Sequence, residues 1–258
     1  MNSILQCLAR APEFLETLQT ATDPLLVSLA QLLSTMRQQA KVVDSLRAFR
    51  KVLGTHLPKF KSTKQEDAKD LLLELLTYTE RTHRPAAELF YGKRADKVTC
   101  TNCGNQTPAE AELFLVPIER RMDSTDISSY LQRAQNDEFQ LTGDNRLKCS
   151  RCQSQSDASV VSKIVKSPKL LVVYIEPFDL AGSRIRHSIS VTEQVTLLSR
   201  KYALYGVVYH HGSSIHSGHF TAAVRYYEVW YRCDDNSVRE VESPSSAEAY
   251  FLFYEALD

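Results

Sequence analysis

The chain has no net charge and no long apolar stretch. Its 258 residues include 31 Lys and Arg side chains and 31 Asp and Glu side chains. Nucleic acids and anionic membranes attract proteins through an excess of positive charge, so we expect neither as a partner. No run approaches the roughly 18 to 20 apolar residues of a membrane-spanning helix, and the amino end lacks the basic and apolar regions of a secretory signal. We therefore expect an intracellular protein of the cytoplasm or the nucleus.

Glycine is scarce, and its placement is informative. Of only eight glycines, Gly212 and Gly218 lie close together in the segment YALYGVVYHHGSSIHSGHFTAAV, residues 202–224. The β-branched and aromatic residues at 205–209 predict a strand, the Gly/Ser cluster after it predicts a loop, and residues 219–224 predict a second strand. We expect His219 to open this second strand behind a flexible loop, where an imidazole is held firmly and can still reach a ligand.

Four of the six cysteines form two pairs with a two-residue gap. These pairs are CTNC at 100–103 and CSRC at 149–152, and two such pairs supply the four thiolates of one tetrahedral zinc site. Both pairs lie in turn sequences, which aim backbone amides at the sulfurs. Two short disulfides or redox dithiols remain the alternative. Cys7 and Cys233 have no partner by spacing, and we expect each to be a small buried apolar residue.

The chain divides into a helical part and a strand-rich part. Apolar residues repeat at helical spacing over 25–36, 42–53 and 68–76, and Ser62 and Thr63 with Gln65 and Glu66 form a capping-box pattern before the third run. After residue 97 the pattern changes to short β-branched runs. The predicted strands are 112–118, 159–165, 169–175, 228–233 and 249–254. Helices followed by antiparallel strands predict an α+β fold.

One histidine and two aspartates form the candidate chemical site. Asp234 and Asp235 follow the predicted strand 228–233 directly, and a hairpin across YYEV brings Asp234 beside His219. A carboxylate there fixes the imidazole tautomer, which gives two of the three groups of a nucleophilic triad. A polar hairpin turn next to an ordinary surface histidine is the alternative that these residues alone leave open.

Six segments together resemble the ubiquitin-specific proteases, a family of papain-like cysteine peptidases. The similar segments, in the family's order, are MNSILQCL at 1–8, QEDAKDLL at 65–72, the two cysteine pairs, the histidine segment at 202–220, and WYRCDDNSV with AYFLFY near the carboxyl end. The resemblance implies a papain-like α+β fold in one catalytic domain, 1–258. Its parts are a helical thumb at 1–92, mainly zinc-binding β fingers at 93–175, and an antiparallel β palm at 176–258.

The resemblance also implies roles for individual residues. His219 is expected to be the general base, Asp234 its orienting partner and Asp235 a polar assistant near the developing oxyanion. Asp67 is expected to contact the carboxyl-terminal tail of ubiquitin, while segments 177–188 and 210–218 cover this tail. Gly212 and Gly218 are expected to let the backbone turn and the thin Gly-Gly tail pass. Structural zinc is expected on Cys100, Cys103, Cys149 and Cys152.

The family's nucleophile is not among these residues. Its cysteine box is written GNTCYMNSxLQ, so the catalytic cysteine is expected two positions before Met1, and the oxyanion asparagine is also upstream. Cys7 is about two helical turns away and is not a substitute. We expect the complete enzyme to hydrolyse the bond after the last glycine of ubiquitin on protein conjugates by thiolate attack. The chain as written is expected to be inactive, either as a truncated enzyme, which we favour, or as a form that only binds ubiquitin.

A non-enzymatic interaction module built around a zinc ribbon is the remaining hypothesis. In that case the helices form a docking surface, and residues 97–155 suffice for binding the partner. Nucleic acid is not expected to bind at the cysteines, because neither pair carries interleaved basic and aromatic residues.

Overall fold

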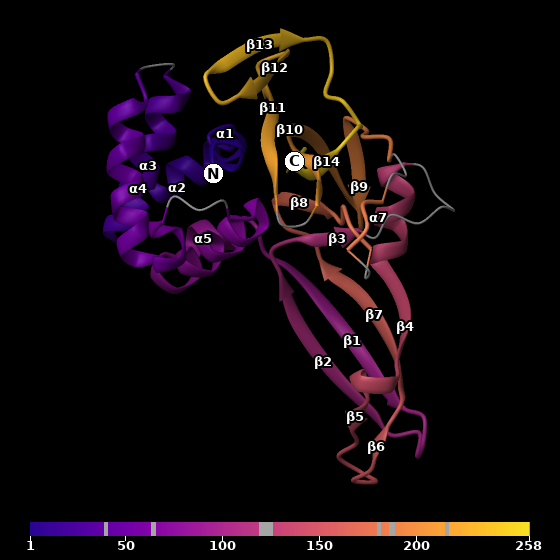
Figure 1. Cartoon of the computed structure of the whole chain (residues 1–258). Coiled ribbons are helices and arrows are strands. Elements are labelled where there is room, and N and C mark those ends of the chain that lie inside the picture. Colours follow the sequence, from indigo (N-terminus) through magenta and orange to yellow (C-terminus); the bar gives the residue numbers. More distant parts are fainter. Residues whose placement is uncertain are drawn as a thin grey trace.

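The structure is a computed structural model in which residues 1–38, 41–62, 66–118, 126–179, 182–185, 189–214 and 217–257 are described. Helices dominate the first part of the chain and antiparallel strands the rest, which confirms the predicted α+β class (Figure 1). Among the described residues, no helix is long and apolar enough to cross a membrane.

The amino-terminal helices form one body, which we call the thumb (Figure 1). The two periodic runs at 25–36 and 42–53 are helical, as predicted. The first of these helices begins at Pro24, and the Asp23 side chain accepts hydrogen bonds from the backbone N–H groups of Leu25 and Leu26. The helices are α1 (Asn2–Leu8), α2 (Pro12–Leu18), α3 (Pro24–Arg37), α4 (Val43–His56), the 3₁₀ turn η1 (Pro58–Lys61), α5 (Ala68–Thr82) and α6 (Arg84–Glu88).

The largest sheet in the described part of the chain has eight strands, and we call it the palm. Its order is β13-β12-β11-β10-β14-β8-β3, with β9 also paired to β10. All neighbours are antiparallel except β3 and β8, which are parallel. The strands are β3 (Val116–Ile118), β8 (Leu170–Ile175), β9 (Gln194–Leu197), β10 (Arg200–Ser214), β11 (Ser217–Tyr226), β12 (Val229–Asp234), β13 (Ser237–Val241) and β14 (Ala249–Ala256).

Both faces of the central palm strands are buried. Along β14, Phe251 and Phe253 pack into the core shared with the thumb, while Leu252 and Tyr254 face a second core on the opposite side. This follows from the alternation of side chains along a strand. The second core includes Ile127 and Leu131 of helix α7 (Ile127–Gln135). The palm is therefore held between α1–α6 on one face and α7 on the other.

A narrower sheet extends away from the palm and forms the fingers (Figure 1). Its strand order is β2-β1-β7-β4, and a short ribbon of β5 and β6 lies toward its tip. The segment 93–175 that was predicted to be mainly fingers also contains the palm strands β3 and β8. The finger elements are β1 (Gly92–Cys100), β2 (Gln106–Leu113), β4 (Asn136–Leu141), the 3₁₀ turn η2 (Gly143–Asn145), β5 (Leu147–Lys148), β6 (Gln155–Ser156) and β7 (Ala158–Lys166).

Two local predictions were wrong. Helix α5 is capped by Asp67, which accepts a hydrogen bond from the Lys69 backbone N–H at 2.7 Å, and not by the Ser62 side of the predicted capping box; residues 63–65 of that box lie outside the described residues. The predicted strand 112–118 is split, because the chain leaves the fingers after Leu113 and enters the palm at Val116. A continuous apolar run does not show where a chain changes sheets.

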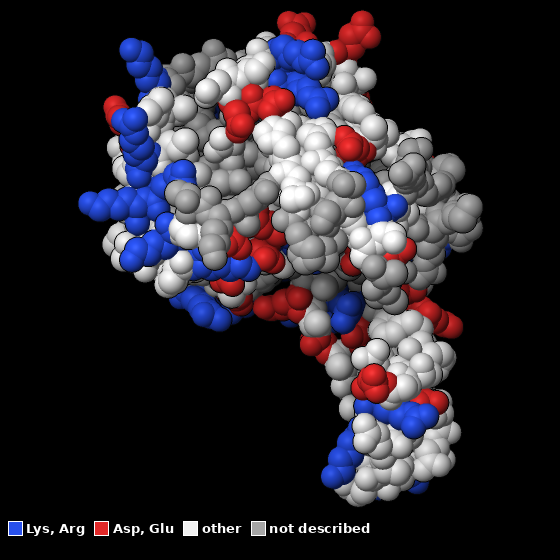
Figure 2. Space-filling view, viewed as in Figure 1, with Lys and Arg blue, Asp and Glu red and all other residues white. Residues whose placement is uncertain are grey.

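The surface carries charges of both signs. On the face shown in Figure 2, Lys and Arg side chains are spread over the thumb, and Asp and Glu side chains lie among them and toward the sheets. This face therefore has no extended surface of a single sign, in keeping with the equal numbers of basic and acidic residues.

Candidate active site

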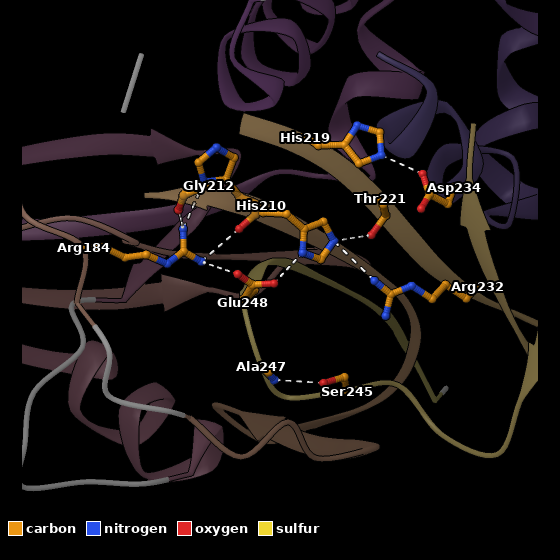
Figure 3. Close-up of polar contacts among 11 residues, drawn as sticks. Arg184, His210, Gly212, His219, Thr221, Arg232, Asp234, Ser245, Ala247 and Glu248 are labelled. Atoms are coloured by element: carbon orange, nitrogen blue, oxygen red, sulfur yellow. Dashed lines mark hydrogen bonds and ion pairs between the residues drawn. The ribbon is translucent and has the colours of Figure 1, made fainter. Parts of the chain in front are cut away.

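The predicted histidine and aspartate meet on neighbouring palm strands. Strands β11 and β12 pair antiparallel with Ala222 opposite Cys233, and this register brings His219 Nε2 to 2.6 Å from Asp234 Oδ1 (Figure 3). Their side chains are 48 % and 49 % exposed, respectively. An ionised carboxylate only accepts hydrogen bonds, so the proton of the neutral ring lies on Nε2, and Nδ1 is left with a lone pair. Nδ1 is therefore the ring nitrogen that can accept a proton.

The electrostatics of the pair follow from this hydrogen bond. The bond from His219 lowers the pKa of Asp234 below the ordinary aspartate value, against a smaller opposing effect of burial. Asp234 is therefore ionised at neutral pH. A fixed negative charge beside the ring also stabilises an imidazolium, the state that a general base passes through.

The second aspartate lies at the turn that follows β12. Asp235 has a left-handed backbone conformation with φ of 47°, and Asn2 Nδ2 of α1 donates a hydrogen bond to its Oδ1 at 3.3 Å. The turn is thus tied to the first helix of the thumb. Among the described residues, Asp235 makes no hydrogen bond to the imidazole of His219.

A cleft of about 280 Å³ lies between the thumb and the palm. His219, Asp235 and Asp67, which were predicted from different segments of the sequence, all line this cleft. The remaining lining residues are Met1, Asn2, Arg50, Leu53, Phe60, Ser62, Glu66, Leu71 and Phe220. No cysteine is among these described lining residues.

Asp67 has a structural position at the start of α5. Its Oδ1 accepts a hydrogen bond from the Tyr250 hydroxyl of β14 at 2.7 Å, in addition to the capping bond from Lys69. Burial is the main cause that raises the pKa of the Tyr250 hydroxyl, and the charge of Asp67 adds to it. The phenol therefore stays protonated and donates to the carboxylate. Asp67 thus joins the thumb to the palm at the cleft.

The glycines of the histidine segment lie in strands and not in a loop. Strand β10 runs to Ser214 and β11 begins at Ser217, so the predicted loop 210–218 is mostly hairpin, and His219 is the third residue of its strand. Neither Gly212 nor Gly218 has a positive φ. The expectation that they let the backbone turn was wrong.

The structure gives a different reason for the two glycines. A Cβ atom on Gly218 would lie 2.1 Å from Nε2 of His210, and a Cβ on Gly212 would lie 2.6 Å from the Ser217 carbonyl oxygen. His210 is 5 % exposed and packs against Phe220, with ring centroids 4.8 Å apart. The absence of a side chain at Gly218 therefore makes room for the buried His210 ring, and its absence at Gly212 lets the backbone of β11 approach closely.

Arg184 connects its own segment to this hairpin (Figure 3). Its guanidinium donates to the His210 carbonyl oxygen at 2.9 Å and to the Gly212 carbonyl oxygen. Burial, followed by the charge of Arg184, lowers the pKa of His210, so this ring is neutral. Part of the predicted loop 177–188 is thus attached to β10, the strand that pairs with β11. Residues 180, 181 and 186–188 of that loop lie outside the described residues.

A second histidine network was not predicted. The His211 ring bonds to Glu248 through Nδ1 and to the buried Thr221 hydroxyl through Nε2 at 2.8 Å. Its centroid lies 6.3 Å from that of His219. The two adjacent histidines before Gly212 were a sequence signal for this network. The sequence around Glu248 does not indicate that Glu248 bonds to His211.

The four paired cysteines form a compact cluster in the fingers. The Sγ atoms of Cys103 and Cys149 are 3.7 Å apart, those of Cys100 and Cys152 are 4.0 Å apart, and all four lie within 4.8 Å of one another. A tetrahedral zinc ion with Zn–S bonds of about 2.3 Å requires sulfurs roughly 3.8 Å apart. A disulfide requires about 2.05 Å, and the cysteines are free thiols. The donor set and spacing fit one zinc ion.

The two halves of the cluster have equivalent backbone geometry. The Cys100 N–H donates to the Asn105 carbonyl oxygen and the Cys149 N–H to the Ser154 carbonyl oxygen. The residue after each second cysteine, Gly104 or Gln153, has a positive φ. Ser154 also bonds to the Cys152 sulfur at 2.9 Å, and this bond is the main cause that lowers the pKa of Cys152 to about 6. Thiolates are the form that binds zinc.

The two remaining cysteines are structural. Cys7 is 0 % exposed and Cys233 is 8 % exposed, and burial raises the pKa of both thiols. Neither lines the cleft. Both are buried small residues, as expected.

Comparison with known proteins gives a consistent result for family and fold. The profile of the family described as "Ubiquitin carboxyl-terminal hydrolase" matches residues 1–254. The chain is similar to ubiquitin carboxyl-terminal hydrolase 23 of Arabidopsis thaliana, at 26 % identity over 98 % of this chain and 34 % of that protein. It is equally similar to the mouse ubiquitin carboxyl-terminal hydrolase 17-like protein B, at 26 % identity over 98 % of this chain and 61 % of that protein. The chain thus spans about a third to three fifths of these relatives.

Solved structures show the same fold. The SAGA DUB module with Ubp8, Sgf11, Sus1 and Sgf73 bound to monoubiquitin matches with a TM-score of 0.79 and 18 % identity, covering 100 % of this chain and 66 % of that chain. The same module bound to ubiquitin aldehyde matches with a TM-score of 0.79 and 17 % identity, covering 100 % and 67 %. At this identity the likeness establishes the architecture of thumb, palm and fingers. The roles of the site residues rest on their own geometry.

Proposed function

Because the chain belongs to the ubiquitin carboxyl-terminal hydrolase family, we propose that the protein containing it is a deubiquitinase that cleaves the bond after the last glycine of ubiquitin on protein conjugates. Family and fold support a deubiquitinase of the ubiquitin-specific protease type. The observation that carries the proposal for this chain is the His219–Asp234 hydrogen bond at the wall of the thumb–palm cleft.

In the proposed reaction, Nδ1 of His219 takes the proton of a cysteine thiol, and the thiolate attacks the carbonyl carbon of the ubiquitin glycine. The imidazolium then gives this proton to the leaving amine, which leaves a thioester. Water attacks the thioester, His219 accepts its proton, and the thiolate is released. Asp234 keeps the ring oriented and stabilises the imidazolium, and Asp235 with Asn2 provides polar groups on the adjoining wall.

The thiol for this reaction is proposed to stand just before Met1. Met1 and Asn2 line the cleft beside His219, so the residues preceding them in a longer chain enter the same cleft. Cys7 is fully buried and does not reach it. The family's cysteine box places its nucleophile two positions before the residue that matches Met1.

The extended tail of ubiquitin is proposed to occupy the cleft. Asp67 is the acidic group on the thumb side, and both of its hydrogen bonds use Oδ1, which leaves Oδ2 for a basic or amide group of the tail. Gly212 and Gly218 are proposed to meet the tail on the palm side through the backbone of the β10–β11 hairpin, just beyond the residues that line the cleft.

Structural zinc is proposed for Cys100, Cys103, Cys149 and Cys152. Four thiolates leave no open coordination position, so the ion contributes stability and no chemistry. It ties the β1–β2 turn to the β5–β6 ribbon, two segments that few apolar contacts join.

The test is to extend the chain at its amino end with GNTCY and to measure release of a fluorophore from the carboxyl terminus of ubiquitin. We expect turnover by the extended chain and none when alanine replaces the added cysteine. His219→Ala in the extended chain is expected to lose turnover and keep the circular dichroism spectrum. Turnover that survives this change would overturn the role of His219.

A ubiquitin-binding form without cleavage is the second candidate. It is favoured by the lack of a cysteine among the described residues that line the cleft. Intact mass and amino-terminal peptide mapping of the protein from its own cells decide between the two. A peptide that extends through an upstream cysteine supports the enzyme; a mature start at Met1 or Asn2, together with ubiquitin binding by the 258-residue chain, supports the binding form.

A further inference from the structure

A second groove, separate from the thumb–palm cleft, collects arginine side chains. It has a volume of about 390 Å³, and none of its lining residues lines the first cleft. Three arginines and three tyrosines face it, together with two glutamates. The charged and hydroxyl-bearing lining residues include Arg10, Arg37, Arg225, Tyr205, Tyr226, Glu228 and Glu255.

Buried polar atoms without partners gather at this groove. The Nε atoms of Arg10 and Arg225 and the hydroxyl of Tyr205 are buried and make no hydrogen bond in the described structure. Tyr205 is 7 % exposed. Buried donors are normally hydrogen-bonded, so three unsatisfied donors beside one groove indicate that an acceptor belongs there.

Arg10 and Arg37 are close enough to repel each other. Burial lowers the pKa of Arg10, and the charge of Arg37 lowers it further. Among the described residues, no carboxylate lies within ion-pair distance of either guanidinium. Arg37 instead donates to the Ala9 carbonyl oxygen at 3.3 Å, and Arg10 lies over the Tyr226 ring at 4.7 Å from its centroid. Partly buried cations are normally paired, so an unpaired couple indicates a missing anion.

The two glutamates do not supply this anion. Glu228 binds Arg225 at 2.5 Å and is itself 88 % exposed, so it occupies only the outer side of that guanidinium. Burial raises the pKa of Glu255, with the charge of Glu13 adding to the effect. The charges of Lys169 and Arg37 act in the opposite direction, so Glu255 lies near Arg37 without forming an ion pair with it among the described residues.

We propose that this groove is a binding site for a phosphate group, held by Arg10, Arg37 and Arg225 with the Tyr205 hydroxyl as a further donor. Guanidinium groups match the geometry of phosphate oxygens and bind them in a bidentate manner. The volume admits inorganic phosphate or a phosphate monoester. The site does not depend on the proposed deubiquitinase activity.

The test measures binding of inorganic phosphate to the 258-residue chain by isothermal titration and by the thermal unfolding temperature, at constant ionic strength set with chloride. The unchanged chain is expected to bind phosphate and to show a higher unfolding temperature with it than with chloride alone. Arg37→Gln is expected to weaken binding roughly tenfold, the effect of losing one charge-assisted contact. Without phosphate its unfolding temperature is expected to equal or exceed that of the unchanged chain, because a repulsive charge is gone.

Two further variants keep the test decisive. Arg47→Gln removes an arginine that is 78 % exposed and lies outside the groove, and it is expected to bind phosphate normally. Tyr205→Phe is expected to weaken binding with no loss of stability, because its hydroxyl has no partner to lose.

A comparison of phosphoserine with inorganic phosphate distinguishes the sources of the phosphate group: tighter binding of phosphoserine indicates a phosphorylated molecule, and equal binding indicates the free ion. Equal responses to phosphate and chloride, or equal losses in the Arg37 and Arg47 variants, would overturn the proposal.

Discussion

One hydrogen bond decides which nitrogen of His219 is free to act as the proposed base. The carboxylate of Asp234 accepts from Nε2, and an amide in its place presents either an oxygen or an N–H to the ring. Asp234→Asn in the chain extended with GNTCY is expected to lower kcat between roughly 10²- and 10⁴-fold, because the imidazole loses the charge that stabilises its protonated form. Steady-state hydrolysis of ubiquitin–fluorophore measures this. A loss below fivefold would contradict the orienting role.

The same pair makes a prediction about pH and stability. The pKa of Asp234 is lowered in the folded state by His219. A lowered pKa of this kind stabilises the fold above the ordinary aspartate pKa, and the contribution disappears as pH falls through the folded-state pKa. The difference in unfolding free energy between the unchanged chain and Asp234→Asn is therefore expected to be present at pH 6 and to disappear as the pH falls below the lowered pKa of Asp234. Urea unfolding of both chains at several pH values measures this difference. A difference that stays the same at every pH would contradict a contribution from the His219–Asp234 pair.

The packing of His210 against a glycine predicts a steric effect. A methyl group at position 218 lies 2.1 Å from His210 Nε2, so the buried ring has to move. Gly218→Ala is expected to destabilise the chain by about 1–3 kcal/mol, the usual cost of overpacking a core. Thermal or urea unfolding measures the change.

A double variant separates this cause from a general effect on the strand. His210→Ala removes the ring, and Gly218→Ala is then expected to cost less in the His210→Ala background than alone. Ser217→Ala, one position earlier in β11 and exposed, is the matched control and is expected to be nearly neutral. Equal costs of Gly218→Ala in both backgrounds would contradict the steric explanation.

At the scale of elements, Asp67 joins helix α5 to strand β14. Removing its carboxylate leaves the first turn of α5 without its cap and the buried Tyr250 hydroxyl without its acceptor. Asp67→Ala is expected to destabilise the chain by about 1–3 kcal/mol. Asparagine caps helices as well as aspartate does, and its side-chain oxygen can accept from Tyr250. Asp67→Asn is therefore expected to unfold at nearly the temperature of the unchanged chain.

This pair of variants separates structure from binding. If Asp67 contacts ubiquitin through its charge, Asp67→Asn weakens ubiquitin binding without loss of stability, as isothermal titration would show. If both variants bind ubiquitin as tightly as the unchanged chain once folded, the carboxylate is only a cap and a thumb–palm contact.

The predictable elements are those whose determinants are local. The two cysteine pairs have their metal-binding spacing within four consecutive residues, and His219 meets Asp234 because a tight hairpin connects β11 to β12. The helices at 25–36 and 42–53 follow from apolar periodicity alone. Within each helix, each cysteine pair and the β11–β12 hairpin, the determinants lie close together along the chain, so a pattern in the sequence was sufficient; only the meeting of the two cysteine pairs spans a longer separation.

The elements that were mispredicted depend on contacts between distant segments. Helix α5 is capped by Asp67 and not by the predicted Ser62 pattern. The second hydrogen-bond partner of Asp67, Tyr250, is 183 positions away in the sequence. The glycines at 212 and 218 were interpreted as loop residues because the sequence does not show that the His210 ring is buried between them and Phe220. Strand β3 separates from β2 because it pairs with β8, more than fifty positions later.

At the scale of the whole molecule, the cysteine cluster and the two hydrophobic cores are separate sources of order. Neither core contains any of the four clustered cysteines. The cores hold the thumb and palm around the cleft, and the finger sheet reaches the second core through Ile164 of β7. The tip of the fingers has little apolar burial of its own, and its β5–β6 ribbon consists of two-residue strands. Metal binding is therefore expected to fold the tip without determining the cleft.

This separation predicts a local response to loss of zinc. The isolated chain is expected to contain one zinc ion, and Cys149→Ser is expected to abolish its tight binding. Hydrogen exchange in the variant is expected to accelerate at residues 100–107 and 147–157, because a bound ion would hold the two turns that contain the Cys100–Asn105 and Cys149–Ser154 backbone hydrogen bonds. Exchange in β8, β10 and β14, which are buried on both faces, is expected to stay slow. Cys233→Ser, a cysteine outside the cluster, is the control that keeps the metal. Uniform acceleration across the palm strands in Cys149→Ser would show instead that the cluster and the cores unfold as one unit.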